Sequence, residues 1–177
     1  MKGNIWVSYY FYGIDKFKST GNGKFEIVHY AYEYNDPSSI SSNSIRSIYV
    51  SKNNVLWVGD DGYGINKTQL KEKFSVYRFN PLDSTSLRSK SIRAVYETPD
   101  GKLLVGGYSP LMTLDRTLGV LPVKCFNEDS KKWQEDIPYA VYCISPDPIF
   151  VDSIVWMGTE GYGLFRYNYV RHTFHQY

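Results

Sequence analysis

Short runs of alternating hydrophobic and polar residues, separated by turn residues, make up most of this chain. In "LWVGDDGYGI", residues 56–65, an apolar run gives way to acidic residues and glycines before a second run begins. The stretch "TPDG", residues 98–101, separates two such runs, and Pro followed by Gly is typical of a tight turn. No stretch of ten residues sustains a helical period. The pattern predicts short antiparallel strands and almost no helix.

One strand pattern recurs along the chain. Trp6, Trp57 and Trp156 each stand between apolar residues, and Leu104 occupies the corresponding place in a fourth copy. The successive spacings are 51, 47 and 52 residues. A period of roughly 40–50 residues is typical of the blades of a β-propeller.

Each repeat contains four strand-like runs, named a to d from the propeller axis outwards, and the Trp lies on strand b. The first repeat opens at strand b, so about fifteen strands are expected. We predict an all-β chain, a β-propeller segment of about four four-stranded antiparallel blades that is part of a larger propeller. The expected units are 3–34 (incomplete), 44–80, 91–129 and 138–177.

The composition fits a folded domain and excludes several classes of function. Hydrophobic residues make up 42% of the 177 residues, and the net charge is only +2, from 20 basic and 18 acidic residues. A dedicated nucleic-acid surface would need clustered positive charge, so no nucleic-acid partner is expected. No apolar run approaches the ~18 residues of a membrane span, so this segment is expected to make no membrane contact. The first residues also lack a signal-peptide run, so any targeting sequence is expected to lie outside this chain.

The two cysteines, Cys125 and Cys143, belong to no CxxC or His-Cys cluster, so neither a metal nor another cofactor is expected. The repeat places Cys125 in the outer strand of the third unit and Cys143 in the inner strand of the fourth. Strands lie roughly 4.8 Å apart, so the pair is expected to exceed the ~7 Å Cα separation that a disulfide allows. Two free thiols are predicted.

Residues 38–67, "SSISSNSIRSIYVSKNNVLWVGDDGYGINK", closely resemble the two-component regulator propeller repeat. Residues 79–107 give a second match and residues 155–168 a third, partial one. Ser8 and Leu104 depart from the pattern, since they replace its Gly and its Trp. The resemblance implies a periplasmic sensor region of a bacterial hybrid two-component histidine kinase, many of which respond to glycan breakdown products. No kinase motif occurs in this chain.

The repeated Trp is expected to pack between neighbouring blades, because large aromatic side chains dominate core packing. A glycine follows two residues after three of the four anchors, at Gly59, Gly106 and Gly158. These glycines are expected to permit tight backbone geometry where strand b ends.

Four tyrosines lie at or beside the link between strands b and c. Tyr12, Tyr63 and Tyr162 stand six residues after the Trp, and Tyr108 stands four residues after Leu104. These links open on one mouth of a propeller, where tyrosines can stack on sugar rings. The alternative is that each Tyr only packs against the next blade.

Charged residues near the same mouth are the other candidates for ligand binding. Arg46 and Arg93 occupy the same place on strand a, where they face either an anionic ligand or an ion-pair partner. Asp61 and Glu160 lie on the b–c links; with Asp60 they either perform acid–base chemistry or form turns. The three histidines, His29, His172 and His175, fall in or near outer strands, where no catalytic or metal role is expected.

Three functions stay open at this point. The first is a non-catalytic sensor of a glycan or oligosaccharide, the second a protein-interaction scaffold, and the third a propeller lyase or hydrolase. The expected partners are a saccharide, other blades or modules of the same protein, and a second copy of the chain. Self-association is expected because an incomplete blade exposes a strand edge and apolar faces.

Overall fold

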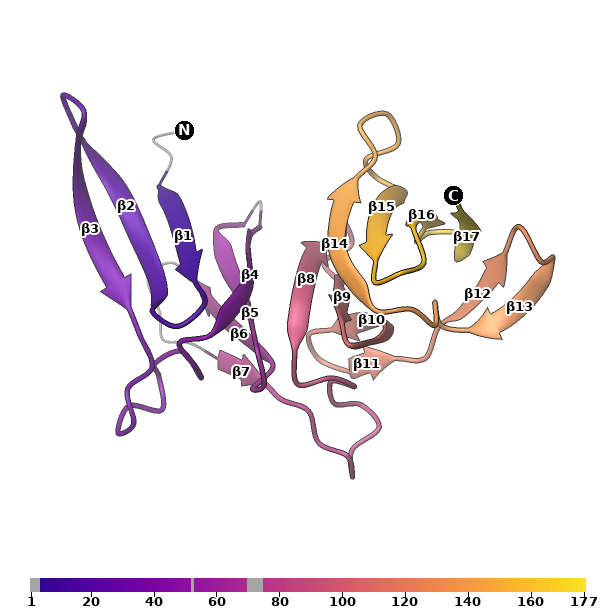
Figure 1. The fold of residues 1–177 in the computed structure, drawn as a ribbon, viewed down its shortest axis with the longest axis horizontal. Coiled ribbons are helices and arrows are strands. Elements are labelled where there is room, and N and C mark those ends of the chain that lie inside the picture. The colour runs from indigo at the N-terminus through magenta and orange to yellow at the C-terminus, as the bar shows by residue number, and fades with distance from the viewer. Residues whose placement is uncertain (1–3, 52, 70–74) are drawn as a thin grey trace.

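The computed structural model describes residues 4–51, 53–69 and 75–177, which form seventeen strands and no helix (Figure 1). Residue 3 of the predicted first unit, and residues 52 and 70–74 of the predicted second unit, lie outside the described residues. The strands form separate sheets, antiparallel except for one pair, that stand side by side along the molecule. The predicted all-β propeller segment is confirmed.

Four sheets follow one another in chain order. The first contains β1 (Ile5–Tyr9), β2 (Gly13–Gly21) and β3 (Lys24–Tyr30). The second contains β4 (Ile45–Val50), β5 (Val55–Asp60), β6 (Ile65–Gln69) and β7 (Ser75–Tyr77). The third contains β8 (Ile92–Glu97), β9 (Leu103–Gly107), β10 (Ser109–Asp115) and β11 (Gly119–Leu121). The fourth contains β14 (Val141–Pro146), β15 (Ile154–Thr159), β16 (Leu164–Asn168) and β17 (Thr173–Gln176).

A hairpin that the repeat did not predict widens the fourth sheet. Its strands are β12 (Lys124–Asn127) and β13 (Lys132–Glu135), and β12 pairs in parallel with β17. Cys125 lies in β12, so its expected place in the outer strand of the third unit is wrong: that outer strand is β11. Cys125 is buried, Cys143 of β14 is exposed, and both are free.

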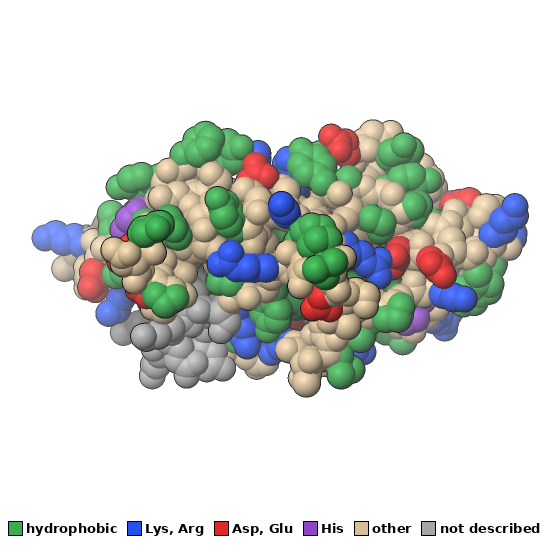
Figure 2. Space-filling model, turned by 90° about the horizontal axis from the view of Figure 1, so that it is seen from below, with side chains coloured by type: hydrophobic (Ala, Val, Ile, Leu, Met, Phe, Trp, Pro, Cys, Tyr) green, Lys and Arg blue, Asp and Glu red, His purple; other side chains and the backbone are tan. Residues whose placement is uncertain are grey.

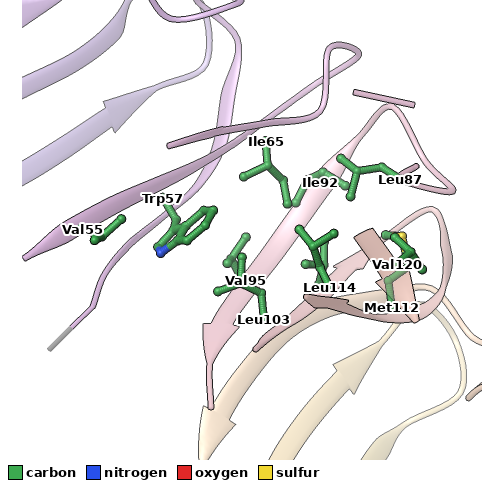
Figure 3. Close-up of a cluster of buried hydrophobic side chains, with 11 residues drawn as sticks. Val55, Trp57, Ile65, Leu87, Ile92, Val95, Leu103, Met112, Leu114 and Val120 are labelled. Atoms are coloured by element: carbon green, nitrogen blue, oxygen red, sulfur yellow. The ribbon is translucent and has the colours of Figure 1, made fainter. Parts of the chain in front are cut away.

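Neighbouring sheets pack through the two faces of each strand, because successive side chains point to opposite sides. In β5, Val55 and Trp57 enter the core between the second and third sheets, where Trp57 is fully buried (Figure 3). Leu56 and Val58 enter the core between the first and second sheets. The expected packing of Trp between blades is confirmed at this position.

Two of the other three anchors also pack against the sheet that follows them in the chain. Trp6 packs partly buried against the core shared with the second sheet, and Leu104 lies in the core shared by the third and fourth. Trp156 is only half-buried, and its indole Nε1 donates to Asp147 at 2.9 Å while its ring lies beside Tyr177. Trp156 therefore contacts residues of its own blade.

Two of the recurrent glycines are needed for the close approach of sheets. A Cβ at Gly59 would lie 2.8 Å from Ile92 of the next sheet, and one at Gly106 would lie 2.6 Å from the carbonyl oxygen of Val141. A side chain in either place would push strand b away from strand a of the following blade. The inner strands β4, β8 and β14 accordingly lie next to one another.

Candidate ligand-binding mouth

One end of the sheets collects the links from strand b to strand c and the starts of the inner strands. In Figure 1 this end points down, and Figure 2 looks onto it from below. Hydrophobic side chains, which include the tyrosines in this colouring, lie there among positive and negative ones. We call this end the mouth.

A β-bulge at the start of each complete inner strand places one side chain at the mouth. The pairing with strand b shifts between Ile45 and Ser47 in β4, and the same shift recurs in β8 and β14. The residue inside each shift is Arg46, Arg93 or Tyr142. Bulges re-aim side chains and are frequent beside functional sites, so three successive bulges give the mouth a regular set of projecting groups.

A second set comes from strand b. The residue four places after each anchor follows the end of that strand, and in chain order these residues are Tyr10, Asp61, Tyr108 and Glu160. Each of the second, third and fourth blades therefore brings one residue from strand a next to one from the b–c link. The pairs differ chemically: the second blade offers Arg and Asp, the third Arg and Tyr, and the fourth Tyr and Glu.

The Asp61 cluster joins three sheets through one carboxylate. Asp61 Oδ2 accepts hydrogen bonds from Arg46 (Nη2 at 2.7 Å) and from the hydroxyl of Tyr10 at 3.0 Å. Asp61 Oδ1 accepts one from Ser91 Oγ at 2.6 Å. The Arg46 guanidinium also lies over the Tyr10 ring, 3.9 Å from its centroid. Tyr10, Arg46 and Ser91 belong to the first, second and third blades.

These contacts hold Asp61 ionised. The hydrogen bond from Ser91 is the largest cause of the shift in the pKa of Asp61. Burial opposes it, and the hydrogen bond from Arg46 adds to it. The net result is a pKa lowered to about 2. The same carboxylate raises the pKa of Arg46. For Arg46, the ion-pair interpretation is the one that the structure supports.

The Arg93 cluster has a different character. The guanidinium lies 4.3 Å from the ring centroid of Tyr108 and 4.5 Å from that of Tyr142, and Arg93 Nη2 donates to the Tyr108 hydroxyl. The two rings meet edge to face, with centroids 5.8 Å apart. Desolvation, followed by a hydrogen bond with Glu160, raises the pKa of Tyr142, so its hydroxyl stays protonated.

The remaining predicted tyrosines contact their immediate neighbours. Tyr162 stacks on Tyr139 with centroids 4.1 Å apart, and Tyr12 lies over His29 at 4.4 Å. Tyr63, in the link after β5, is 52% exposed. Whether any of the three contacts a ligand stays a prediction.

Asp60 is a turn-former. It is fully buried and accepts hydrogen bonds from the backbone N–H groups of Tyr63 and Gly64, at 2.7 and 2.9 Å, and from Ser41 Oγ at 2.6 Å. Its neighbour Asp61 instead projects to the mouth. Two adjacent carboxylates thus have separate roles.

Sequence reasoning missed Tyr10, Ser91 and Tyr142. Counting four residues from every anchor, the offset at which Tyr108 lies, would have found Tyr10. Aligning the starts of the inner strands would have placed Tyr142 with Arg46 and Arg93. Ser91 carries no signal in the sequence, because its role depends on how the second and third sheets approach each other.

The opposite end of the sheets carries two clefts. One, of about 540 Å³, lies between the third and fourth sheets, with Lys102, Tyr169 and His172 in its lining. The other, of about 560 Å³, includes Tyr49 and Tyr96. Neither cleft includes a residue that the sequence analysis proposed as ligand-binding.

Within the described part of the chain, no group of three or more His, Cys, Asp or Glu side chains is arranged to hold a metal ion, and no helix is long and apolar enough to cross a membrane.

Comparison with known families supports the resemblance noted in the sequence. Residues 39–62 match the family described as two component regulator propeller, inside the stretch 38–67 that carries the resemblance. The chain thus contains this repeat, as predicted. No curated protein sequence matches the chain.

Solved structures share the fold at low identity. The extracellular domain of the hybrid two component system BT3049 from B. thetaiotaomicron is 21% identical, with a TM-score of 0.60. The match covers 97% of this chain and 28% of that one, so this chain spans little more than a quarter of that domain.

Two further structures belong to other classes of protein. YCF48 bound to D1 peptide is 13% identical with a TM-score of 0.60, and the match covers 99% of this chain and 50% of that one. Virginiamycin B lyase from Staphylococcus aureus is 14% identical with a TM-score of 0.53, and the match covers 96% of this chain and 64% of that one. These identities carry the fold alone.

Proposed function

We propose that this chain is part of the periplasmic sensor region of a hybrid two-component system, and that it binds a glycan or oligosaccharide without chemical conversion. Two findings support the proposal: the propeller repeat at residues 39–62 and the likeness to an extracellular domain of such a system. The ligand would contact the mouth, and the kinase would lie elsewhere in the protein.

The observation that carries the proposal is the alternation of cationic, aromatic and acidic side chains around the mouth. Three bulges in successive blades project Arg46, Arg93 and Tyr142, and each stands beside a residue of the b–c link. If the side chains that the bulges project only packed against one another, a bulge in every blade would not be needed, because regular strands also pack. Recurrent bulges at one end fit a surface that is shaped for contact with a ligand.

The chemistry of these groups suits a carbohydrate. Tyr108 is 52% exposed and Tyr10 is 41% exposed, so both rings have free surface on which the C–H face of a sugar can stack. Hydroxyl, guanidinium and carboxylate groups stand beside them to hydrogen-bond the sugar hydroxyls. Few polar groups around aromatic surface are typical of small-molecule sites.

Acid–base catalysis finds less support at the mouth. Asp61, with a pKa of about 2, carries no proton to donate near neutral pH, and three side chains occupy its two oxygens. Glu160 accepts a hydrogen bond from Tyr142, whose raised pKa keeps the phenol neutral. A binding role therefore fits these residues better than a role as acid or base.

Signalling would follow from differential binding. A saccharide that contacts two or more blades, or this mouth and a neighbouring module, favours the arrangement in which all of its contacts form. The free energy of that preference biases the downstream kinase between its two states.

A glycan array probed with the 177-residue chain tests the proposal, followed by titration calorimetry of the glycans that bind. Tyr108→Ala is expected to weaken glycan binding at least about tenfold, because the stacking of the sugar ring on the tyrosine ring is lost. Trp133→Ala is the matched control, since this aromatic is 64% exposed on the β12–β13 hairpin. Binding that survives Tyr108→Ala unchanged would place the site elsewhere.

A protein-interaction scaffold is the second candidate. The β12–β13 hairpin extends the fourth sheet with an edge strand and an exposed Trp133, which lies 5.4 Å from the ring of Phe126. An exposed aromatic on a strand edge suits a protein partner. An array without any binding glycan, together with partner capture that Trp133→Ala abolishes, would favour this candidate.

A further inference from the structure

Arg46 and Arg93 hold the same bulge position in consecutive blades, but only Arg46 is neutralised. The residue four places after the anchor is Asp61 in the second blade and Tyr108 in the third. Arg46 therefore forms an ion pair of 2.7 Å, whereas Arg93 donates to a neutral phenol. Among the described residues, no carboxylate forms an ion pair with Arg93.

Among the described residues, three of the four other half-buried arginines form an ion pair with a carboxylate, and Arg166 is the exception. Arg88 pairs with Asp136 and Arg116 with Glu97, both at partly buried positions. Arg93 is half-buried and has no such carboxylate, while its Nε, like that of Arg116, is buried without a hydrogen-bond partner. A half-buried cation without a counter-charge is costly, so an anionic acceptor that reaches the Nη groups of Arg93 gains affinity.

The aromatic side chains fix the guanidinium in place. Tyr108 and Tyr142 lie within 4.3 and 4.5 Å of it, so two ring faces hold its plane before any ligand arrives. A guanidinium that is already oriented loses little rotamer freedom on binding. Its planar set of donors matches the geometry of a carboxylate or a sulfate.

The neighbouring negative charges are already engaged. Asp61 is neutralised by Arg46, and Glu160 accepts a hydrogen bond from Tyr142. Negative charge from Glu160 disfavours an anion on the fourth blade, so an anionic group is directed to the Arg93 side. Glu160 remains suited to accept hydrogen bonds from ligand hydroxyls.

We propose that Arg93 binds the anionic group of the ligand, and that the ligand is an acidic saccharide: a uronic acid through its carboxylate or a sulfated sugar through its sulfate. This inference rests on the proposed glycan-binding function and makes it more specific. The sugar ring attached to that group would stack on Tyr108, and its hydroxyls would reach towards Glu160.

Calorimetry with matched probes tests the inference. The probes are trigalacturonate, its neutral methyl ester and a sulfated chondroitin disaccharide, so that carboxylate, ester and sulfate are compared. Binding of at least one acidic probe is expected, and Arg93→Gln should weaken it by about 10- to 100-fold, because a charge-assisted bidentate contact is lost. Raising the salt concentration should weaken the binding of the acidic probe and leave the binding of the ester unchanged.

Two further variants separate charge from fold. Arg93→Lys keeps the charge and is expected to retain part of the affinity, while losing the bidentate geometry. Arg171→Gln removes the same charge from an exposed position in the turn between β16 and β17 and should leave the affinity for the acidic probe unchanged. Thermal unfolding of each variant checks that the fold is intact.

The outcomes distinguish this inference from the function on which it rests. If the ester binds as well as the acid, or if Arg93→Gln leaves acid binding unchanged, Arg93 is not an anion site. If a neutral glycan on the array binds and no acidic probe does, the inference fails while the proposed function stands. If no glycan of any class binds, the proposed function fails, and the inference fails with it.

Discussion

Ser91 Oγ donates a 2.6 Å hydrogen bond to Asp61, although the two residues belong to different blades. Asp61 directly follows β5 of the second sheet, and Ser91 directly precedes β8 of the third. Their backbones also form an isolated β-bridge. The other carboxylate oxygen accepts hydrogen bonds from Tyr10 and Arg46. One side chain at the mouth therefore links three blades, so the mouth contributes to stability as well as to the proposed binding.

The stability that Asp61 contributes is expected to depend on pH. Its pKa is lowered from 3.8 to about 2, so the folded state binds its proton less tightly than the unfolded state. The contribution is fully present above pH ~4 and is lost as the pH falls towards ~2. Asp61→Asn should lower the free energy of unfolding by about 1–2 kcal/mol at pH 7, after allowance for partial exposure, and by much less at pH 2.5.

Urea unfolding of the wild-type chain and of Asp61→Asn at pH 7, 4 and 2.5 measures this difference in the free energy of unfolding. Glu26→Gln is the control, because this carboxylate is 56% exposed and its ion pair with Lys18 lies on the surface. A difference between wild type and Asp61→Asn that stays constant across the three pH values would contradict the assigned role.

Trp57 and Trp156 are expected to contribute unequally to stability despite their equivalent places in the repeat. Trp57 is fully buried between the second and third sheets, so Trp57→Ala should cost about 3–5 kcal/mol through lost burial and an internal cavity. Trp156 is half-buried and contacts Asp147 and Tyr177 of its own blade. Its replacement by Ala should cost about 1–2 kcal/mol. Equal losses in the free energy of unfolding of the two variants, measured by chemical denaturation, would show that the anchors are equivalent.

The fold was predictable because its signals are local and repeated. An anchor about every 50 residues, Trp in three units and Leu in one, marks strand b without knowledge of its neighbours. The β12–β13 hairpin was not predictable in this way, since it has no counterpart in the other units. Its pairing with β17 joins residues about 50 positions apart in parallel, and nothing in the pattern near Cys125 indicates this.

The site was predictable only in part, because it depends on register. Arg46 and Arg93 stood out as charged residues at one place in the repeat, and both do reach the mouth. Tyr142 lacks that charge and was overlooked, although the same bulge projects it. The contrast between a neutralised Arg46 and an unpaired Arg93 also depends on which side chains face each other across blades, as Ser91 and Asp61 do.

The two thiols are expected to react at very different rates. Cys143 is exposed on β14, whereas Cys125 is buried in β12 beside the hydroxyl of Tyr167. Burial raises the pKa of Cys125 to about 11, so its thiolate fraction is negligible near pH 8. Iodoacetamide at pH 8 should modify only Cys143 in the native protein and both cysteines in urea, as read by mass spectrometry. Rapid native modification of Cys125 would show that the hairpin detaches from β17.

We propose, finally, that the 177-residue chain associates with itself. Apolar residues of the first sheet share the face that points away from the second sheet: Ile5 pairs with Phe17, which pairs with Ile27. Ile5 is 54% exposed and Ile27 is 58% exposed. Within the described residues, the inner edge of β1 pairs with no other strand. Exposed apolar surface beside a free strand edge favours pairing with another copy.

Light scattering at micromolar concentration measures this association, and a dimer is expected because two-fold contacts are the commonest in homo-oligomers. Ile27→Lys places a charge in the middle of the apolar face and should shift the protein to a monomer without loss of its fold. Leu82→Lys is the control, since Leu82 is 94% exposed in the link between β7 and β8 and should leave the dimer intact. A wild-type chain that stays monomeric and thermally stable up to high micromolar concentration would show that this face needs no partner.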